Sequence, residues 1–154
     1  MRGPQTLGRY QFIVGNNDFA VTAADTQRLK DDAAQTKRDV GPYALYFVIT
    51  GETDAIAQRK WTYYQEGADL EAIAYMTGQT NLDVLGSTAA IITPMQNAFA
   101  LNIGRIVGSP TTVAKQFDEL TSIDGLKGVM CIFDDFEAGT EDFGRHVMPL
   151  LHCR

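Results

Sequence analysis

The feature that most constrains this chain is an uninterrupted apolar run at residues 128–133, which reads GVMCIF and ends at Asp134 and Asp135. A strand with water on one face alternates apolar and polar residues, and this run does not. Both faces are therefore expected to be covered, as in a central parallel strand between helices. Ligands of α/β folds bind beyond the carboxyl ends of such strands, so the two aspartates mark a candidate site, although a solvated turn is the simpler interpretation.

A second continuous run, YALYFVI at residues 43–49, predicts another buried strand, and helical patterns separate these runs. The chain therefore predicts an α/β fold with parallel strands. Two further strands are expected, at 10–14 and, weakly, at 103–107. Helices are expected at 22–37, from the cap Thr53 to Gln65, from the cap Asp69 to Met76 and from the Ser109-Pro110 start through Leu120. A loop is expected over 78–102, and a short last helix is introduced by Gly139 and Thr140 and ended by Pro149.

Composition narrows the class of protein. The 154 residues carry a net charge of −6, which disfavours nucleic acid and anionic membrane as partners. The longest apolar runs fall well short of the ~20 residues that span a bilayer, and no signal peptide is visible at the start of the chain. The two cysteines fit a reducing compartment, with Cys131 in a buried strand and Cys153 exposed. We expect a cytoplasmic protein.

Several catalytic motifs are missing from the sequence. It contains no P-loop, no G-x-G-x-x-G turn and no G-x-S-x-G elbow. The only histidines, His146 and His152, have no spacing that supports a nucleophilic triad. Five carboxylates within residues 134–142 would suit a hard cation, but the EF-hand spacing is absent, and an acidic loop before a helix is the favoured interpretation.

Local geometry alone suggests where a ligand would bind. A Ser109-Pro110 helix start offers N–H groups to a phosphate, but simple capping by Ser109 explains the same residues. If any side chains contact substrate or cofactor, those in the loops after the strands are the best placed. These candidates are Asn16, Asn17, Thr50, Asp134 and Asp135.

Groups of residues spread along most of the chain resemble the pyrimidine-oxidising branch of the luciferase-like, flavin-dependent monooxygenases. They are Glu52-Thr53-Asp54-Ala55, Lys60-Trp61, Tyr64, Glu66-Gly67-Ala68-Asp69 and Glu71-Ala72; Ile106-Val107-Gly108-Ser109, Val113-Ala114 and Asp118-Glu119; and Gly128-Val129, Phe133-Asp134-Asp135-Phe136, Gly139, Glu141, Phe143-Gly144, Pro149-Leu150 and Cys153-Arg154. The resemblance implies the carboxyl-terminal part of a (β/α)8 barrel, because a whole barrel takes about 250 residues and only three or four strands are visible.

The resemblance further implies oxygenation of uracil or thymine, with ring opening to a ureidoacrylate. Reduced FMN would come from a separate NADH-dependent flavin reductase and would react with O2. The flavin contacts of the family lie upstream of the matching positions, so no flavin ligand is assigned in this sequence. Residues 1–154 would then form a single partial domain, inactive alone, with a homo-oligomer or an amino-terminal barrel half completing it.

Two rival interpretations remain open. One is a non-catalytic α/β module that buries its sheet edges by dimerisation or by docking to another chain. The other is a metal-binding domain around Asp134 and Asp135.

Overall fold

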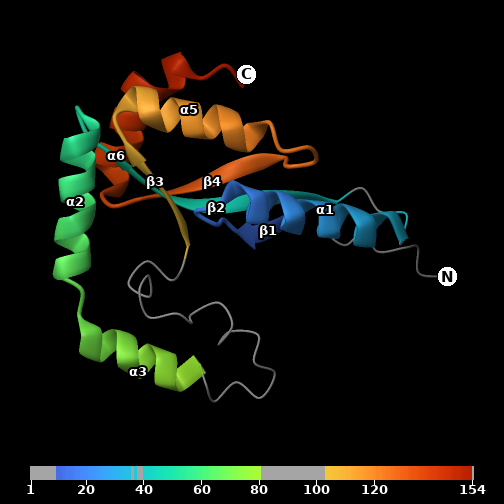
Figure 1. The fold of residues 1–154 in the computed structure, drawn as a ribbon, viewed down its shortest axis with the longest axis horizontal. Helices are drawn as coiled ribbons and strands as arrows, with labels where there is room; N and C mark the ends of the chain where they lie inside the picture. Colours follow the sequence, from blue (N-terminus) through green and yellow to red (C-terminus); the bar gives the residue numbers. More distant parts are fainter. Residues whose placement is uncertain (1–9, 36, 38–39, 81–102, 154) are drawn as a thin grey trace.

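The computed structural model describes residues 10–35, 37, 40–80 and 103–153, which form a parallel sheet and its flanking helices (Figure 1). The elements are β1 (Tyr10–Val14), α1 (Phe19–Gln35), β2 (Gly41–Thr50), α2 (Asp54–Glu66), α3 (Leu70–Thr80), β3 (Gly104–Gly108), α5 (Pro110–Thr121), β4 (Gly128–Phe133), α6 (Phe136–Asp142), a π-helix (Phe143–Val147) and a 3-10 turn (Met148–Leu150). Residues 81–102 of the expected loop lie outside the described residues, whereas residues 78–80 belong to α3.

The central strand is β2. Its residues 43–45 pair with both β1 and β4, and its residues 46–48 pair with both β3 and β4. Because a strand has two edges, β1 and β3 must lie end to end along one edge of β2, and β4 must lie along the other (Figure 1). The Gly104 N–H, which donates to the Gly15 carbonyl at 2.8 Å, joins the end of β1 to the start of β3.

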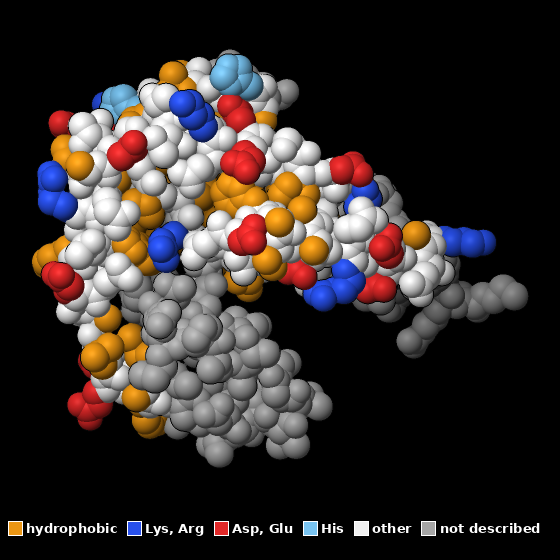
Figure 2. Space-filling view, in the orientation of Figure 1, with side chains coloured by type: hydrophobic (Ala, Val, Ile, Leu, Met, Phe, Trp, Pro, Cys, Tyr) orange, Lys and Arg blue, Asp and Glu red, His pale blue; other side chains and the backbone are white. Residues whose placement is uncertain are grey.

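One face of this sheet carries the hydrophobic core. Partners in parallel register point to the same face, and on this face Tyr46 of β2 lies level with Cys131 of β4. The apolar side chains of this face pack against α5 and the π-helix, and α1 also contacts β2. Figure 2 shows hydrophobic side chains gathered between α1 and α5 on the viewed surface. The buried members are Ala44, Tyr46, Val48, Ile106, Val113, Ala114, Phe117, Leu120 and Val147.

Buried polar groups tie α1 to β2. The Tyr46 hydroxyl donates to the Asn16 carbonyl at 3.0 Å and lies 2.8 Å from the Thr22 hydroxyl, which accepts the Asn16 N–H. Burial raises the pKa of Tyr46 even though these two contacts oppose the shift. The network fixes the turn between β1 and α1.

Helix starts follow local capping chemistry. Thr53 accepts the Ile56 N–H, Asp69 accepts the Ala72 N–H and Ser109 accepts the Thr112 N–H, as the sequence predicts. Two starts were predicted too late. Helix α1 begins at Phe19 because Asp18 accepts the Ala20 N–H, and α6 begins at Phe136 because Asp135 accepts the Ala138 N–H.

The prediction that strand 128–133 is central and covered on both faces is wrong for the described residues. Strand β4 pairs only with β2 there, so it forms an edge of the sheet. Cys131 points into the core, where burial raises its thiol pKa to about 11, whereas Met130 points to the opposite face and is exposed. Both cysteines are free thiols. None of the described helices is long and apolar enough to cross a bilayer.

Candidate functional site

An open cleft of about 780 Å³ lies beyond the carboxyl end of β2. Thr50 ends that strand, and α2 and α6 supply most of the other walls. Helix α6 comes close because Gly139 is buried against Phe133 of β4, where a Cβ atom would lie 2.7 Å from the Phe133 Cβ. The lining residues are Thr50, Gly51, Glu52, Ile56, Lys60, Pro110, Ala138, Gly139, Asp142 and His146.

Asp142 joins two polar side chains of this cleft. It accepts a hydrogen bond from the Thr50 hydroxyl through Oδ2, and its Oδ1 lies 2.7 Å from Nδ1 of His146. Partial burial would raise the pKa of Asp142, but the hydrogen bonds from Thr50 and His146 outweigh it and hold the pKa below its usual range. With Nδ1 engaged, Nε2 is the remaining ring nitrogen with which His146 can exchange a proton.

Lys60 joins the cleft to the end of β4. Its ammonium lies 2.6 Å from Oδ2 of Asp134, and the Tyr64 hydroxyl donates to the same oxygen at 2.7 Å. The Asp134 side chain is only 4% exposed; burial would raise its pKa, but the bonds from Lys60 and Tyr64 outweigh that effect and lower it. The hydrogen bond to Asp134 raises the pKa of Tyr64 to about 12. Two turns of α2 are thereby held against the end of β4.

The sequence candidates do not all meet at this cleft. Thr50 lines it, and Asp134 reaches it through Lys60, whereas the Asp135 carboxylate caps α6. Asn17 accepts the Arg105 N–H at 2.9 Å, and Asn16 accepts the Asp18 N–H at 2.9 Å. Both asparagines lie away from the cleft because β1 is staggered: Val14 is level with Leu45, five residues before Thr50.

The start of α5 already holds an anion of the chain itself. Asp54 accepts the Ser109 N–H at 2.7 Å, and this backbone bond, aided by Thr112 and Ser109 side chains, lowers the pKa of Asp54. Ser109 also caps the helix with its own hydroxyl. This arrangement favours the capping interpretation of Ser109 over phosphate binding, so the described residues at this helix start do not fit a flavin phosphate.

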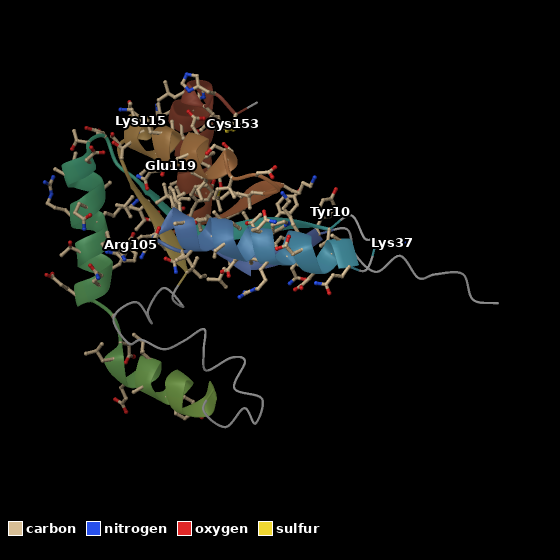
Figure 3. The ribbon with its side chains drawn as sticks, turned by 45° about the vertical axis from the view of Figure 1, so that its right-hand side comes forward. Tyr10, Lys37, Arg105, Lys115, Glu119 and Cys153 are labelled. Atoms are coloured by element: carbon tan, nitrogen blue, oxygen red, sulfur yellow. The ribbon has the colours of Figure 1, made fainter. Side chains whose placement is uncertain are left out.

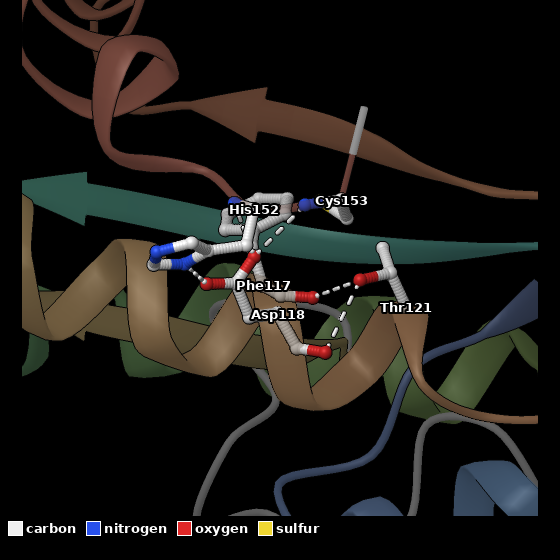
Figure 4. Close-up of polar contacts among 5 residues, drawn as sticks. All are labelled: Phe117, Asp118, Thr121, His152 and Cys153. Atoms are coloured by element: carbon white, nitrogen blue, oxygen red, sulfur yellow. Dashed lines mark hydrogen bonds and ion pairs between the residues drawn. The ribbon is translucent and has the colours of Figure 1, made fainter.

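His152 lies at a different place from His146. Asp118 of α5 binds the carboxyl-terminal segment: it accepts the His152 and Cys153 N–H groups at 2.9 and 3.2 Å and contacts the His152 ring at 2.7 Å (Figure 4). The hydrogen bond from the His152 side chain is the main cause of the lowered Asp118 pKa. The contact fastens the chain end to α5.

Arg105 of β3 lies against α2, with its guanidinium carbon 4.7 Å from the centre of the Trp61 ring (Figure 3). Among the described residues no group of three or more His, Cys, Asp or Glu side chains could hold a metal ion. Asp134 and Asp135, the aspartates of the rival metal interpretation, are bound to Lys60, Tyr64 and the start of α6.

Sequence reasoning did not single out Lys60, Asp142 or His146 as a group. Lys60 bonds to Asp134, 74 residues further along the chain, and Asp142 bonds to Thr50, 92 residues before it. The spacing of Asp142 and His146, four residues apart on a helical segment, was the one available signal.

Curated proteins similar to this chain are pyrimidine monooxygenases. The chain is 44% identical over 139 residues to "Pyrimidine monooxygenase RutA" of Escherichia coli O127:H6, covering 88% of this chain and 38% of that protein. RutA of Escherichia coli O1:K1 gives the same identity and covers 36% of its length. The chain thus spans well under half the length of these relatives, and the family resemblance seen in the sequence is confirmed. No protein-family model matches.

Solved structures agree on the fold. Riboflavin lyase RcaE has a TM-score of 0.71 at 21% identity, over 93% of this chain and 38% of its own. DmoA from Hyphomicrobium sulfonivorans has a TM-score of 0.70 at 18% identity, over 97% and 39%. Long-chain alkane monooxygenase LadA has a TM-score of 0.69 at 20% identity, over 92% and 36%. The predicted fold, a parallel α/β part of a (β/α)8 barrel, is confirmed.

Proposed function

We propose that this chain is part of a flavin-dependent monooxygenase that acts on a pyrimidine ring. The observation that carries this proposal is the 44% identity to RutA over 88% of the chain. The proposal extends to residues 1–154 as one partial domain that requires the rest of a barrel for activity. It also extends to a uracil or thymine substrate and to ring opening that yields a ureidoacrylate.

The cofactor we propose is FMN, which a separate NADH-dependent flavin reductase reduces. When bound, the reduced FMN would supply the oxygen chemistry. The solved neighbours include a riboflavin lyase with modified FMN, which supports flavin use. The described residues at the start of α5 do not fit the flavin phosphate, because Asp54 occupies that position. We therefore place the main flavin contacts in the part of the relatives that this chain does not match.

The cleft beyond β2 suits the polar edge of a pyrimidine dione. Such a ring presents carbonyl oxygens, which need donors, and an imide N–H, which needs an acceptor. Lys60 offers a cationic donor, and Glu52 and Asp142 offer acceptors along the same walls. In this role Asp142 would also orient His146, whose second ring nitrogen could exchange a proton with a bound ring.

A non-catalytic docking or dimerisation module is the second candidate. It is favoured by an exposed apolar surface on β1 and β4. In this case the chain would associate stably with a partner but would not contribute to any flavin or pyrimidine site.

Titration of the 154-residue chain with FMN, followed by flavin fluorescence and repeated with reduced flavin under argon, tests the two candidates. Our proposal predicts no saturable micromolar binding by the chain alone and binding once the missing part of the barrel is present. If the completed protein is folded but still binds no flavin, the monooxygenase proposal fails and the docking module is preferred.

A further inference from the structure

The charges around the cleft beyond β2 are unevenly matched. Among the described residues that line it, Lys60 is the only lysine or arginine, whereas Glu52 and Asp142 each bring a carboxylate. A third carboxylate, that of Asp134, does not line the cleft, but its Oδ2 lies 2.6 Å from the Lys60 ammonium. With His146 neutral, these groups carry one positive and three negative charges. The cleft is therefore negatively charged even though a cation lines its wall.

Asp134 is a fixed partner for this cation. Its side chain is only 4% exposed, whereas that of Lys60 is 40% exposed, and the Tyr64 hydroxyl donates to the same carboxylate oxygen at 2.7 Å. Burial would raise the pKa of Asp134, but the bonds from Lys60 and Tyr64 lower it, so the carboxylate is ionised at neutral pH. An ionised carboxylate at this distance cancels most of the charge that the Lys60 ammonium would otherwise present to the cleft.

A lysine that is paired in this way favours different ligands from an unpaired one. The ammonium has three N–H donors, so Lys60 can bind Asp134 and still donate to a neutral carbonyl oxygen. An anion placed beside Lys60 would instead meet the surplus of carboxylates on and behind the cleft walls. Repulsion between like charges is one way in which a site rejects a close relative of its ligand.

We propose that Asp134 is a positioning residue that sets the ligand specificity of the cleft through Lys60. It holds the ammonium as a donor to a neutral ring carbonyl and cancels its charge. The cleft therefore rejects a pyrimidine dione that carries a carboxylate or phosphate group. This inference rests on the proposed function, because it takes a pyrimidine ring as the ligand.

Titration of the 154-residue chain with uracil and with orotate, the same ring bearing a carboxylate, tests this inference. Binding is followed by NMR of the Thr50 and Gly51 amides at the cleft, at about pH 8, where an ordinary histidine is neutral. The wild type should bind uracil more tightly than orotate. Asp134→Asn keeps the shape of the side chain and removes its charge, so it should shift the ratio of the two dissociation constants at least about tenfold toward orotate.

Three further variants separate the charge of Asp134 from its packing. Asp134→Glu keeps the charge, and Tyr64→Phe removes only the second donor to the carboxylate, so both should keep the wild-type ratio. Glu137→Gln removes an exposed carboxylate of α6 that does not line the cleft, and it should also leave the ratio unchanged.

The salt dependence of the wild type provides a test that needs no variant. Added salt should strengthen orotate binding relative to uracil binding, because it screens the repulsion between the ligand and the carboxylates. This measurement decides the question even if Asp134→Asn does not fold. If the chain alone is not folded, the same titrations use a chimera in which this chain replaces the matched part of the Escherichia coli relative.

The inference is overturned if the wild type prefers orotate, if salt leaves the ratio unchanged, or if folded Asp134→Asn gives the wild-type ratio. It is also overturned if Tyr64→Phe shifts the ratio as much as Asp134→Asn does, because the effect would then come from structure and not from charge. A different result separates the two proposals: if neither protein binds uracil but Asp134→Asn gains orotate binding, the pyrimidine proposal fails and the role of Asp134 stands.

Discussion

The Thr50 hydroxyl donates a hydrogen bond to Asp142, although 92 residues separate the two side chains. This bond joins the end of the central strand to α6, and the same carboxylate contacts His146. The cleft therefore has a wall whose geometry depends on one carboxylate.

We expect Asp142→Asn to lower the free energy of unfolding by about 1 kcal/mol at neutral pH, because the amide keeps only one of the two acceptor oxygens. The folded-state pKa of Asp142 is lowered, so its contribution is present above the unfolded pKa and is lost as the pH falls through the folded pKa. Urea unfolding from neutral to acidic pH checks this. Glu141→Gln, which removes an exposed ion pair with Arg145, should change stability little; an equal loss in both variants would refute the role of Asp142.

Lys60→Met should destabilise the protein by about 2 kcal/mol, because it leaves the Asp134 carboxylate in place with one donor fewer. The loss should be smaller than for a fully buried ion pair, because the Lys60 side chain is partly exposed. The pKa of Asp134 should rise toward its unfolded value, so the part of the stability that Asp134 loses on acidification should be smaller than in the wild type. Arg59→Met, an exposed neighbour on α2, is the control. If the free energy of unfolding depended on acidic pH in the same way for Lys60→Met and the wild type, this would count against the pairing of Lys60 with Asp134.

Asp118→Ala should release the carboxyl-terminal segment from α5. Hydrogen exchange of the His152 and Cys153 amides, both bonded to Asp118 (Figure 4), should accelerate. In the wild type the lowered pKa of Asp118 means that protection is kept above its unfolded pKa and lost as the pH falls through the folded value. Glu119→Ala, one residue along the helix, should leave exchange unchanged (Figure 3). Unaltered protection in Asp118→Ala would show that other contacts hold the segment.

Two glycine substitutions compare a packed position with an open one. Gly139→Ala should cost about 1–3 kcal/mol, because the new Cβ would lie 2.7 Å from that of Phe133 and would push α6 away from β4. Gly144→Ala meets no atom within 4 Å and should be neutral or stabilising. Thermal unfolding measures both, and a Tm for Gly139→Ala at or above that of Gly144→Ala would mean that α6 does not pack closely.

Much of the fold was accessible from sequence because its signals are local. The caps Thr53, Asp69 and Ser109 satisfy helix N–H groups within three residues, and the apolar run 43–49 lies in a buried strand. The apolar run at 128–133 led to the wrong prediction that both faces of this strand are covered within the chain. An apolar face looks the same in sequence whether the chain itself or a partner covers it. Met130 is exposed on that second face.

The site was less accessible because its contacts join distant parts of the chain. Thr50 was found from its place at a strand end, but its partner Asp142 depends on how α6 lies across the sheet. Asn16 and Asn17 were grouped with Thr50 on the assumption that all the strands end at one level. The stagger of β1, set by the pairing of Val14 with Leu45, separates them.

We propose that this chain serves as part of a flavin-dependent pyrimidine monooxygenase. The most direct test is uracil consumption by a chimera in which this chain replaces the matched residues of the Escherichia coli relative, assayed with FMN, a flavin reductase, NADH and O2. We predict oxygen-dependent loss of uracil and formation of a ring-opened product, with no turnover by the 154-residue chain alone. A folded chimera that binds FMN and leaves uracil unchanged would contradict the account.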